Sequence, residues 1–339
     1  MKVEMVQLGL TTRCNSNCYF CFREELKRAG RKEGNVDFPV EGVKKILDQG
    51  VRDIQLCCNR GEAIFHPEFH TIVDMIKSSG SRFEMNTNGD LFGPKTWYDL
   101  GQKMTEGDQV IFALDGLKNT HEKYRNTNWV NVIKNMKAFI EGGGNAIWQM
   151  ILFRHNEHQI DIVKNLSKSI GCKETWIINS RYYNETYRRP SKGYNKTKED
   201  ILKTQLPENI ECRFFYGKRV YIDVYGKVWP CCYLKCHFGF EERAYPNNPM
   251  TELYEREKDV IDVMNTPLND IIKSKLFKFA FNHMYDSSIH IEELKPHPKE
   301  GCLMKHPEYM INFACQLYCG RNDEIDSKNR RNIVNSTLL

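Results

Sequence analysis

Runs typical of β-strands alternate with longer runs typical of helices over the first half of this 339-residue chain. Strands are predicted at 6–10, 54–58, 82–86, 109–114, 147–153 and 175–178. Amphipathic helices are predicted around 39–47, 67–76, 94–104, 128–141 and 157–169. Such alternation favours a parallel sheet with right-handed crossovers. The predicted fold is α/β, a partial (β/α)6 TIM-like barrel with its active site at the carboxyl ends of the strands.

The polar stretch 23–35 is predicted to be a connecting segment. Residues 181–211 also lack the hydrophobic periodicity of helices and strands. The basic, tyrosine-rich part of it, 181–203, predicts a solvated linker, with binding of an acidic peptide or RNA as the alternative. Beyond it, alternating runs around Tyr225-Gly226 predict a β-hairpin, followed by a helix around 267–281. The predicted division is a core domain at 1–180, a linker at 181–211, a small second domain at 212–322 and a polar tail at 323–339.

The composition of the chain indicates the cellular compartment in which it is expected to act. Hydrophobic residues make up 40% of it, and no run approaches the ~20 apolar residues of a membrane span. The N-terminus enters a strand pattern without the apolar core of a signal peptide, so we expect a cytoplasmic protein with no membrane partner. In a reducing cytosol, 13 cysteines favour metal ligation over disulfides. The net charge of +5 is too small to indicate a nucleic-acid partner.

Three cysteines crowd into the loop after the first predicted strand. Cys14, Cys18 and Cys21 are separated by three and then two residues. Thiolates favour iron–sulfur clusters, zinc or copper(I), and a structural zinc site is usually closed by four protein ligands. A set of three therefore indicates a metal centre that keeps one position open, with a zinc knuckle or a chance grouping as the alternative.

This CxxxCxxC pattern, with the aromatic Phe20 before its last cysteine, resembles the radical S-adenosylmethionine (radical SAM) enzymes. In that family three cysteines hold a [4Fe–4S] cluster, and SAM binds the fourth iron. The resemblance implies that Cys14, Cys18 and Cys21 are catalytic. It also implies that a donor such as flavodoxin or ferredoxin reduces the cluster, and that SAM yields a 5′-deoxyadenosyl radical, which abstracts a hydrogen atom from the substrate.

Two turns that follow the next strands resemble the SAM-binding turns of the family. Gly61-Glu62 stands where the family has Gly-Gly-Glu-Pro, although Arg60 and Ala63 depart from that pattern. A carboxylate there is expected to accept from the SAM ammonium group, and glycine lets the main chain approach closely. Asn88 belongs to an Asn-Thr-Asn-Gly turn like the one near the SAM ribose. Ordinary turns remain the alternative for both.

A third segment resembles the subfamily that modifies peptides. Leu114-Asp115-Gly116 is followed by His121, which is expected to be structural, and by Arg125. The resemblance implies that Arg125 clamps the SAM carboxylate, with a solvated helix face as the alternative. Ala113 replaces the family's serine. The cofactor-binding residues implied by the resemblance are Phe20, Gly61, Glu62, Asn88 and Arg125.

Cysteines return in the last third of the chain. Their spacing resembles the auxiliary-cluster extension called SPASM, or its short form, twitch. Only seven cysteines follow residue 172, and two clusters of four cysteines each would need more. Cys231 and Cys232 are also expected to be neighbours in one strand, on opposite faces. The prediction is one auxiliary [4Fe–4S] cluster, with a zinc site as the alternative, held by Cys212, Cys231, Cys315 and Cys319.

Other cysteines have no assigned role: Cys57, Cys58, Cys232, Cys236 and Cys302. Cys57 or Cys58 is either a hydrogen-atom donor to a substrate radical or a small buried hydrophobe. The predicted function is oxidation, crosslinking or epimerisation of a peptide or protein side chain. The chain begins at its first strand, so we expect no N-terminal leader-binding domain. A small sugar or aminocyclitol substrate, a tRNA substrate, and a metal-binding interaction module without enzymatic activity remain the alternatives.

Overall fold

The computed structural model describes residues 2–28, 30, 34–57, 59–180, 184–191, 212, 214, 217–237 and 249–284. The chain divides into two compact units. The first contains residues 4–193 and 222–226, and the second contains 1–3, 194–221 and 227–339. Within the described ranges, no helix combines the length and apolar character needed to cross a membrane.

A parallel sheet forms the centre of the first unit. Its strands are β1 (Met5–Leu8), β2 (Asp53–Leu56), β3 (Arg82–Thr87), β4 (Gln109–Ala113), β5 (Ala146–Leu152) and β6 (Glu174–Asn179). They lie side by side in the order β6-β5-β4-β3-β2-β1, and each neighbouring pair is parallel. The predicted α/β class and the parallel sheet are confirmed. All carboxyl ends of these strands therefore lie at one edge.

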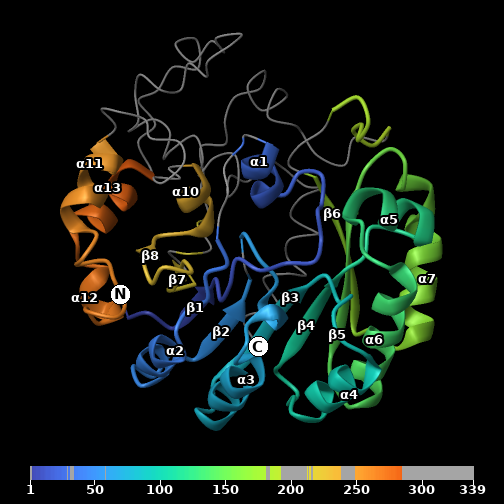
Figure 1. The fold of residues 1–339 in the computed structure, drawn as a ribbon, viewed down its shortest axis with the longest axis horizontal. Helices are drawn as coiled ribbons and strands as arrows, with labels where there is room; N and C mark the ends of the chain where they lie inside the picture. Colours follow the sequence, from blue (N-terminus) through green and yellow to red (C-terminus); the bar gives the residue numbers. More distant parts are fainter. Residues whose placement is uncertain are drawn as a thin grey trace. The chain divides into compact units, whose positions relative to one another are not determined.

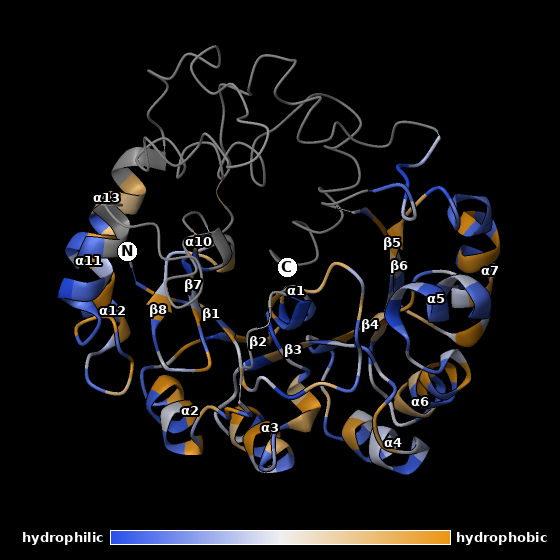
Figure 2. Cartoon of the chain, turned by 45° about the horizontal axis from the view of Figure 1, so that its top comes forward, coloured by the Kyte–Doolittle hydropathy of each residue, from blue (hydrophilic) through white to orange (hydrophobic). Residues whose placement is uncertain are grey.

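Helices connect these strands. They are α1 (Phe22–Arg28), α2 (Val40–Leu47), α3 (Phe69–Ser78), α4 (Pro94–Gln102), α5 (Lys118–Arg125), α6 (Trp129–Glu141) and α7 (Ile160–Ile170), with short 3₁₀ turns η1 (Ala63–Phe65) and η2 (Glu157–Gln159). Figure 1 shows α2, α3, α4, α6 and α7 along one face of the sheet. Figure 2 shows that α2, α3 and α4 each have hydrophobic and hydrophilic sides. The hydrophobic sides bury against the strands.

The two faces of the sheet differ in chemistry. On the helix-covered face, Phe112 of β4 packs against Trp97 of α4 and Phe139 of α6, with ring centroids 5.1 and 5.8 Å away. Alternate residues point to the other face, where Glu84 of β3 accepts hydrogen bonds from Gln55 of β2 and Gln109 of β4. Apolar packing thus fixes the sheet on one side, and the other side carries polar groups.

The second unit contains β7 (Arg219–Ile222, whose last residue belongs to the first unit), β8 (Val228–Trp229), α10 (Cys232–His237), α11 (Pro249–Glu257), α12 (Leu268–Ile271) and α13 (Lys275–Met284). The predicted hairpin is confirmed, since β7 and β8 are neighbours and Gly226 has a φ of 83°. Trp229 stacks on Tyr254 of α11 at 5.2 Å.

Two predictions of local structure are wrong. Residues 23–28 of the expected connecting segment belong to α1. Cys231 and Cys232 do not share a strand, since β8 ends at Trp229 and Cys232 begins α10. In addition, α11 was not predicted, and the helix expected around 267–281 is divided into α12 and α13. The domain boundaries proposed from the sequence stay predictions.

Candidate active site

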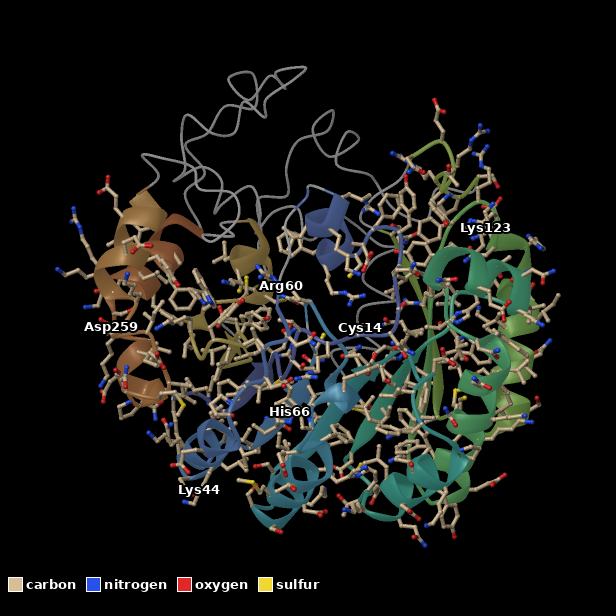
Figure 3. The ribbon with its side chains drawn as sticks, in the orientation of Figure 1. Cys14, Lys44, Arg60, His66, Lys123 and Asp259 are labelled. Atoms are coloured by element: carbon tan, nitrogen blue, oxygen red, sulfur yellow. The ribbon has the colours of Figure 1, made fainter. Side chains whose placement is uncertain are left out.

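The cysteine loop follows β1 and is anchored on both sides. At its start, Thr12 Oγ1 donates to Gly34 O at 2.9 Å, and Arg13 forms an ion pair with Asp37 at 2.9 Å. At its end, the guanidinium of Arg23 on α1 donates to the carbonyl oxygens of Cys14, at 3.1 Å, and Ser16. Figure 3 shows Cys14 well apart from Lys44 of α2. The loop is therefore fixed where the strands end.

Hydrogen-bond donors surround the sulfur atoms of this loop. The backbone N–H of Ser16 and Nδ2 of Asn88 lie 3.4 and 3.8 Å from Cys14 Sγ. Ser16 Oγ and Arg125 Nη1 lie 3.0 and 3.9 Å from Cys18 Sγ. Burial and the nearby Glu62 raise the pKa of Cys14 to about 12. Burial and Cys18 also raise the pKa of Cys21. Thiolates at these positions therefore need a cation beside them.

The three sulfur atoms do not form a site for a single ion. In the part of the chain that the structure describes, no three histidine, cysteine, aspartate or glutamate side chains are placed to hold one metal ion. The structure records Cys14, Cys18 and Cys21 as thiols without disulfides. The chemistry of the donor set, three soft ligands on one short loop, fits an iron–sulfur cluster, which spreads its ligands over several irons.

Glu62 lies beside the loop and is buried. A Cβ at Gly61 would lie 1.9 Å from the carbonyl oxygen of Thr11, so only glycine fits where the two segments cross. Glu62 Oε2 accepts from the backbone N–H of Asn88 at 2.7 Å, while Oε1 is buried without a hydrogen bond. Burial raises the pKa of Glu62 to about 7, against the opposing effects of Asn88, Thr87 and Arg125. The site thus holds a carboxylate oxygen that lacks a donor.

Asn88 ties the turn after β3 to the cysteine loop. Besides bonding Glu62 through its backbone, its Nδ2 donates to Asn15 Oδ1 at 2.8 Å. The next residue, Gly89, has a φ of 70°, and a Cβ there would come within 2.8 Å of the Phe112 ring. This turn therefore needs its glycine, and it joins two of the segments predicted to bind the cofactor.

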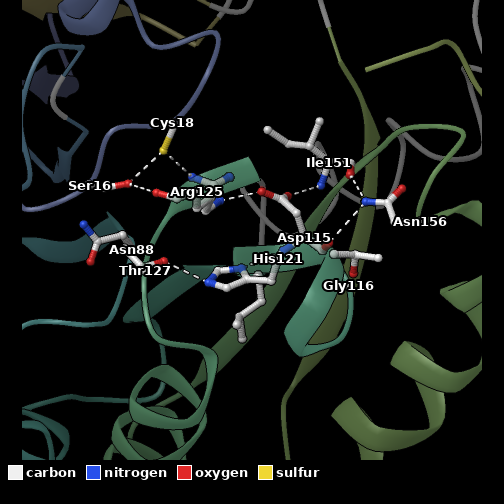
Figure 4. A network of polar contacts seen from close by, with 12 residues as sticks. Ser16, Cys18, Asn88, Asp115, Gly116, His121, Arg125, Thr127, Ile151 and Asn156 are labelled. Carbon is white, nitrogen blue, oxygen red and sulfur yellow. Dashed lines mark hydrogen bonds and ion pairs between the residues drawn. The ribbon is translucent and has the colours of Figure 1, made fainter. Parts of the chain in front are cut away.

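The Arg125 side chain is only 12% exposed, so it does not lie on a solvated helix face. Its Nε donates to Asp115 Oδ2 at 2.5 Å, and Asp115 Oδ1 accepts from the Ile151 backbone at 2.6 Å. Burial alone would lower the pKa of Arg125, but the charges of Asp115 and Cys18 raise it. Figure 4 shows this network from the cysteine loop to β5.

Phe20 belongs to an aromatic cluster next to the loop. Its ring lies 5.8 Å from Tyr187, 6.3 Å from Tyr124 and 6.3 Å from Phe153. The structure therefore brings together all the predicted cofactor-binding segments. Ser16 and Tyr187 were not predicted as site residues, because a serine in a polar loop gives no signal and Tyr187 lies in the predicted linker.

The second unit holds part of the predicted auxiliary ligand set. Cys212 and Cys231 are buried, with 5% and 8% of their surface exposed. Cys315 and Cys319 lie outside the described residues, as do Cys58 and Cys302. Because Cys231 and Cys232 do not share a strand, the alternation of side chains along a strand does not place them on opposite faces. The prediction of a single auxiliary cluster is therefore supported only by the number of cysteines. Cys57 directly follows β2 and is half-buried.

Residues 8–167 match the family model described as the radical SAM superfamily. The chain is 30% identical over 201 residues to a probable GTP 3′,8-cyclase of Methanothermobacter marburgensis, which covers 52% of this chain and 62% of that protein. It is 29% identical over 119 residues to the tungsten-containing aldehyde ferredoxin oxidoreductase cofactor-modifying protein of Pyrococcus furiosus, covering 34% of this chain and 32% of that protein. The chain thus spans less than two thirds of either relative.

Two solved structures have a similar fold. Streptococcus suis SuiB bound to S-adenosylmethionine superposes with a TM-score of 0.54 at 15% identity, covering 81% of this chain and 71% of that one. The anSMEcpe structure with bound AdoMet and Cp18Cys peptide superposes with a TM-score of 0.57 at 14% identity, covering 98% of both chains. At these identities the likeness shows a shared fold.

Proposed function

We propose that this chain modifies a peptide or protein side chain. Its residues 8–167 match the radical SAM superfamily, whose enzymes use a [4Fe–4S] cluster and SAM. In this proposal Cys14, Cys18 and Cys21 hold the cluster. When bound, the cluster and SAM supply a 5′-deoxyadenosyl radical that takes a hydrogen atom from the substrate. The protein binds SAM, excludes water and positions one C–H bond.

One observation carries the SAM-binding part of this proposal. Glu62 Oε1 is buried beside the cysteine loop without a hydrogen-bond donor. A buried carboxylate oxygen left unpaired is costly, and a charged donor from a ligand would remove that cost. The ammonium group of SAM is such a donor. Gly61 supports the assignment, because its lack of a side chain lets the main chain pass close to Thr11, and the next N–H, that of Glu62, donates to Arg13 O at 2.7 Å.

Arg125 is assigned the SAM carboxylate. Asp115 holds its Nε, and its Nη1 lies 3.9 Å from Cys18 Sγ, so the guanidinium is fixed beside the cysteine loop. A guanidinium held on one edge by a buried carboxylate is already oriented, so less rotamer entropy is lost when it binds a second carboxylate. Glu62 and Arg125 thus offer one acceptor and one donor for the two charged ends of an amino acid.

A peptide substrate is supported by the two similar solved structures. SuiB has also been solved bound to the precursor peptide SuiA, and anSMEcpe with the Cp18Cys peptide. We also assign an auxiliary [4Fe–4S] cluster to Cys212, Cys231, Cys315 and Cys319. That cluster would either accept the electron left on the substrate or anchor the substrate. A flavodoxin or ferredoxin would reduce the other cluster, at the cysteine loop.

A second candidate substrate is a purine nucleotide. It is favoured by the 30% identity with a probable GTP 3′,8-cyclase, which is higher than the identity with the peptide-bound structures. In that case the same SAM-binding residues serve a different C–H bond.

The two candidates predict changes in different molecules: the first predicts a modified peptide, and the second predicts a modified purine nucleotide. The test co-expresses the enzyme with peptides encoded by neighbouring genes and, separately, incubates it with GTP, SAM and a reductant. A peptide that loses hydrogen or gains a crosslink, or that takes up deuterium from heavy water on epimerisation, would support the first candidate. A changed GTP with unchanged peptides would contradict it and favour the second.

A further inference from the structure

Ser16 occupies an unusual position between the cysteine loop and α5. Its hydroxyl oxygen lies 3.0 Å from Cys18 Sγ and donates to the carbonyl oxygen of Arg125 at 2.7 Å. The side chain is buried, with 4% of the residue exposed, so water has little access to it. One hydroxyl therefore stands between a predicted cluster ligand and the last carbonyl of a helix.

That hydroxyl has one proton and two acceptors. While Cys18 is a thiol, its S–H can donate to Ser16 Oγ, and the Ser16 proton goes to Arg125. A metal-bound sulfur carries no proton. A hydrogen bond between Cys18 Sγ and Ser16 Oγ then has to use the proton of Ser16, which the hydroxyl would supply by turning from the Arg125 carbonyl to the sulfur.

The guanidinium of Arg125 reinforces the same sulfur. Its Nη1 lies 3.9 Å from Cys18 Sγ, and Asp115 holds its Nε at 2.5 Å. Asp115 is fully buried and is fixed in turn by the Ile151 backbone. Figure 4 shows this chain of contacts from Ser16 and Cys18 through Arg125 to Asp115 and Ile151. The cation therefore cannot swing away from the sulfur without breaking a buried ion pair.

We propose that Ser16 is a positioning residue that, together with the Asp115-held Arg125, raises the reduction potential of the cysteine-loop cluster through Cys18. This inference rests on the proposed function, since it needs a cluster at that loop. A hydrogen bond and a positive charge at a ligand sulfur both stabilise the reduced cluster, which is the more negative state. In this proposal the hydroxyl acts on electron transfer to the cluster.

The test is a redox titration of the anaerobically reconstituted full chain, followed by the electron paramagnetic resonance signal of the reduced cluster. The signal that changes when SAM is added identifies the cysteine-loop cluster. In Ser16→Ala its potential is expected to become more negative. Ser16→Thr, which restores the hydroxyl, should return it towards the wild-type value. Ser169→Ala is the matched control, because Ser169 lies exposed on α7 and bonds only Leu166 O.

Three results would overturn the inference. They are a Ser16→Ala potential equal to that of the wild type at full iron content, a shift that Ser16→Thr does not reverse, and a Ser16→Ala protein that binds less iron. The last would make Ser16 a structural residue of the loop. Failure of the proposed function looks different, because the wild type itself would then take up no iron and show no signal that responds to SAM.

Discussion

Glu62 and Arg125 are the residues whose burial is hardest to explain without a ligand. Both lie at the carboxyl edge of the sheet, and Glu62 Oε1 is buried without a hydrogen-bond partner among the described residues. Burying a charged group is unfavourable unless it is paired. Asn88 holds Glu62 and Asp115 holds Arg125, while Glu62 Oε1 is left for the ammonium group of SAM.

Replacing Glu62 by Gln should therefore weaken SAM binding. The neutral amide keeps the size of the side chain but removes the charge, and a charge-assisted hydrogen bond is worth about 1.5–3 kcal/mol, roughly tenfold to a hundredfold in affinity. Glu68→Gln is the matched control, since Glu68 lies exposed before α3. Equilibrium binding of SAM to the reconstituted protein measures the effect. A change of less than about threefold in Glu62→Gln would remove this residue from the site.

His121 makes folding sensitive to acid. Its Nδ1 accepts from the Asp115 backbone at 3.2 Å and its Nε2 lies 2.8 Å from Thr127 Oγ1, which fits a neutral ring. Burial, aided by the charge of Arg125, lowers the pKa of His121 to about 3. The unfolded chain takes up a proton near pH 6.5 that the folded chain does not take up until about pH 3.

The free energy of unfolding should therefore fall as the pH decreases from about 6.5, by up to about 1.4 kcal/mol per pH unit from this group. Urea unfolding of wild type and His121→Gln across that range measures it. The variant is expected to be less stable at neutral pH but to lose less stability on acidification. Parallel pH profiles for the two proteins would show that His121 is not the group responsible.

Which residues meet at the site was predictable only in part. Glu62, Asn88 and Arg125 stand in turns whose local pattern identifies them, and the sheet brings those turns to one edge. Ser16 was missed because its role depends on the docking of α5 onto the loop, a contact between residues 109 positions apart. Nothing in the local sequence encodes such a contact.

At the scale of elements, α4 and α6 approach each other through glycines. A Cβ at Gly101 would lie 2.3 Å from Phe139 O, and one at Gly142 would lie 2.3 Å from Tyr98 O. These are backbone atoms, which cannot move aside as a flexible side chain can. The two helices that cover β4 are therefore packed closely enough to exclude a methyl group.

Gly101→Ala should destabilise the protein by about 1–3 kcal/mol, the usual cost of overpacking, even though alanine favours helices. Gly107→Ala is the control, because the nearest atom to its Cβ would be Arg82 Cδ at 3.6 Å, an ordinary contact. Chemical denaturation of both variants gives the comparison. Equal stability of Gly101→Ala and wild type would mean that α4 and α6 move apart to make room for the methyl group without a measurable cost in free energy.

The strand and helix alternation was predictable because each strand is short and carries apolar residues at alternate positions or in runs, and each covering helix has an apolar stripe. The error at α1 has a physical cause. Residues 22–28 are mostly charged, and the helix is held by tertiary contacts: Arg23 bonds the carbonyls of the cysteine loop, and Leu26 is buried. At Cys231, the strand pattern continued past the point where α10 begins.

For the whole molecule, the proposed ligand sets predict the metal content. One cluster at the cysteine loop and one at Cys212, Cys231, Cys315 and Cys319 give about eight irons per chain. Replacing Cys212 and Cys231 by Ala should reduce this to about four. Iron and sulfide analysis after anaerobic reconstitution measures both values. About twelve irons in the wild type would indicate a second auxiliary cluster, and about four irons with zinc would replace the auxiliary cluster by a zinc site.

The central claim is that Cys14, Cys18 and Cys21 hold the cluster at which SAM is cleaved. The most direct measurement is 5′-deoxyadenosine formed from SAM and a reductant by the reconstituted wild type and by a variant with all three cysteines changed to Ala. The wild type is expected to form it, and the triple variant is expected to form none while retaining the iron of the second unit. Equal amounts of 5′-deoxyadenosine from the two proteins would contradict the claim.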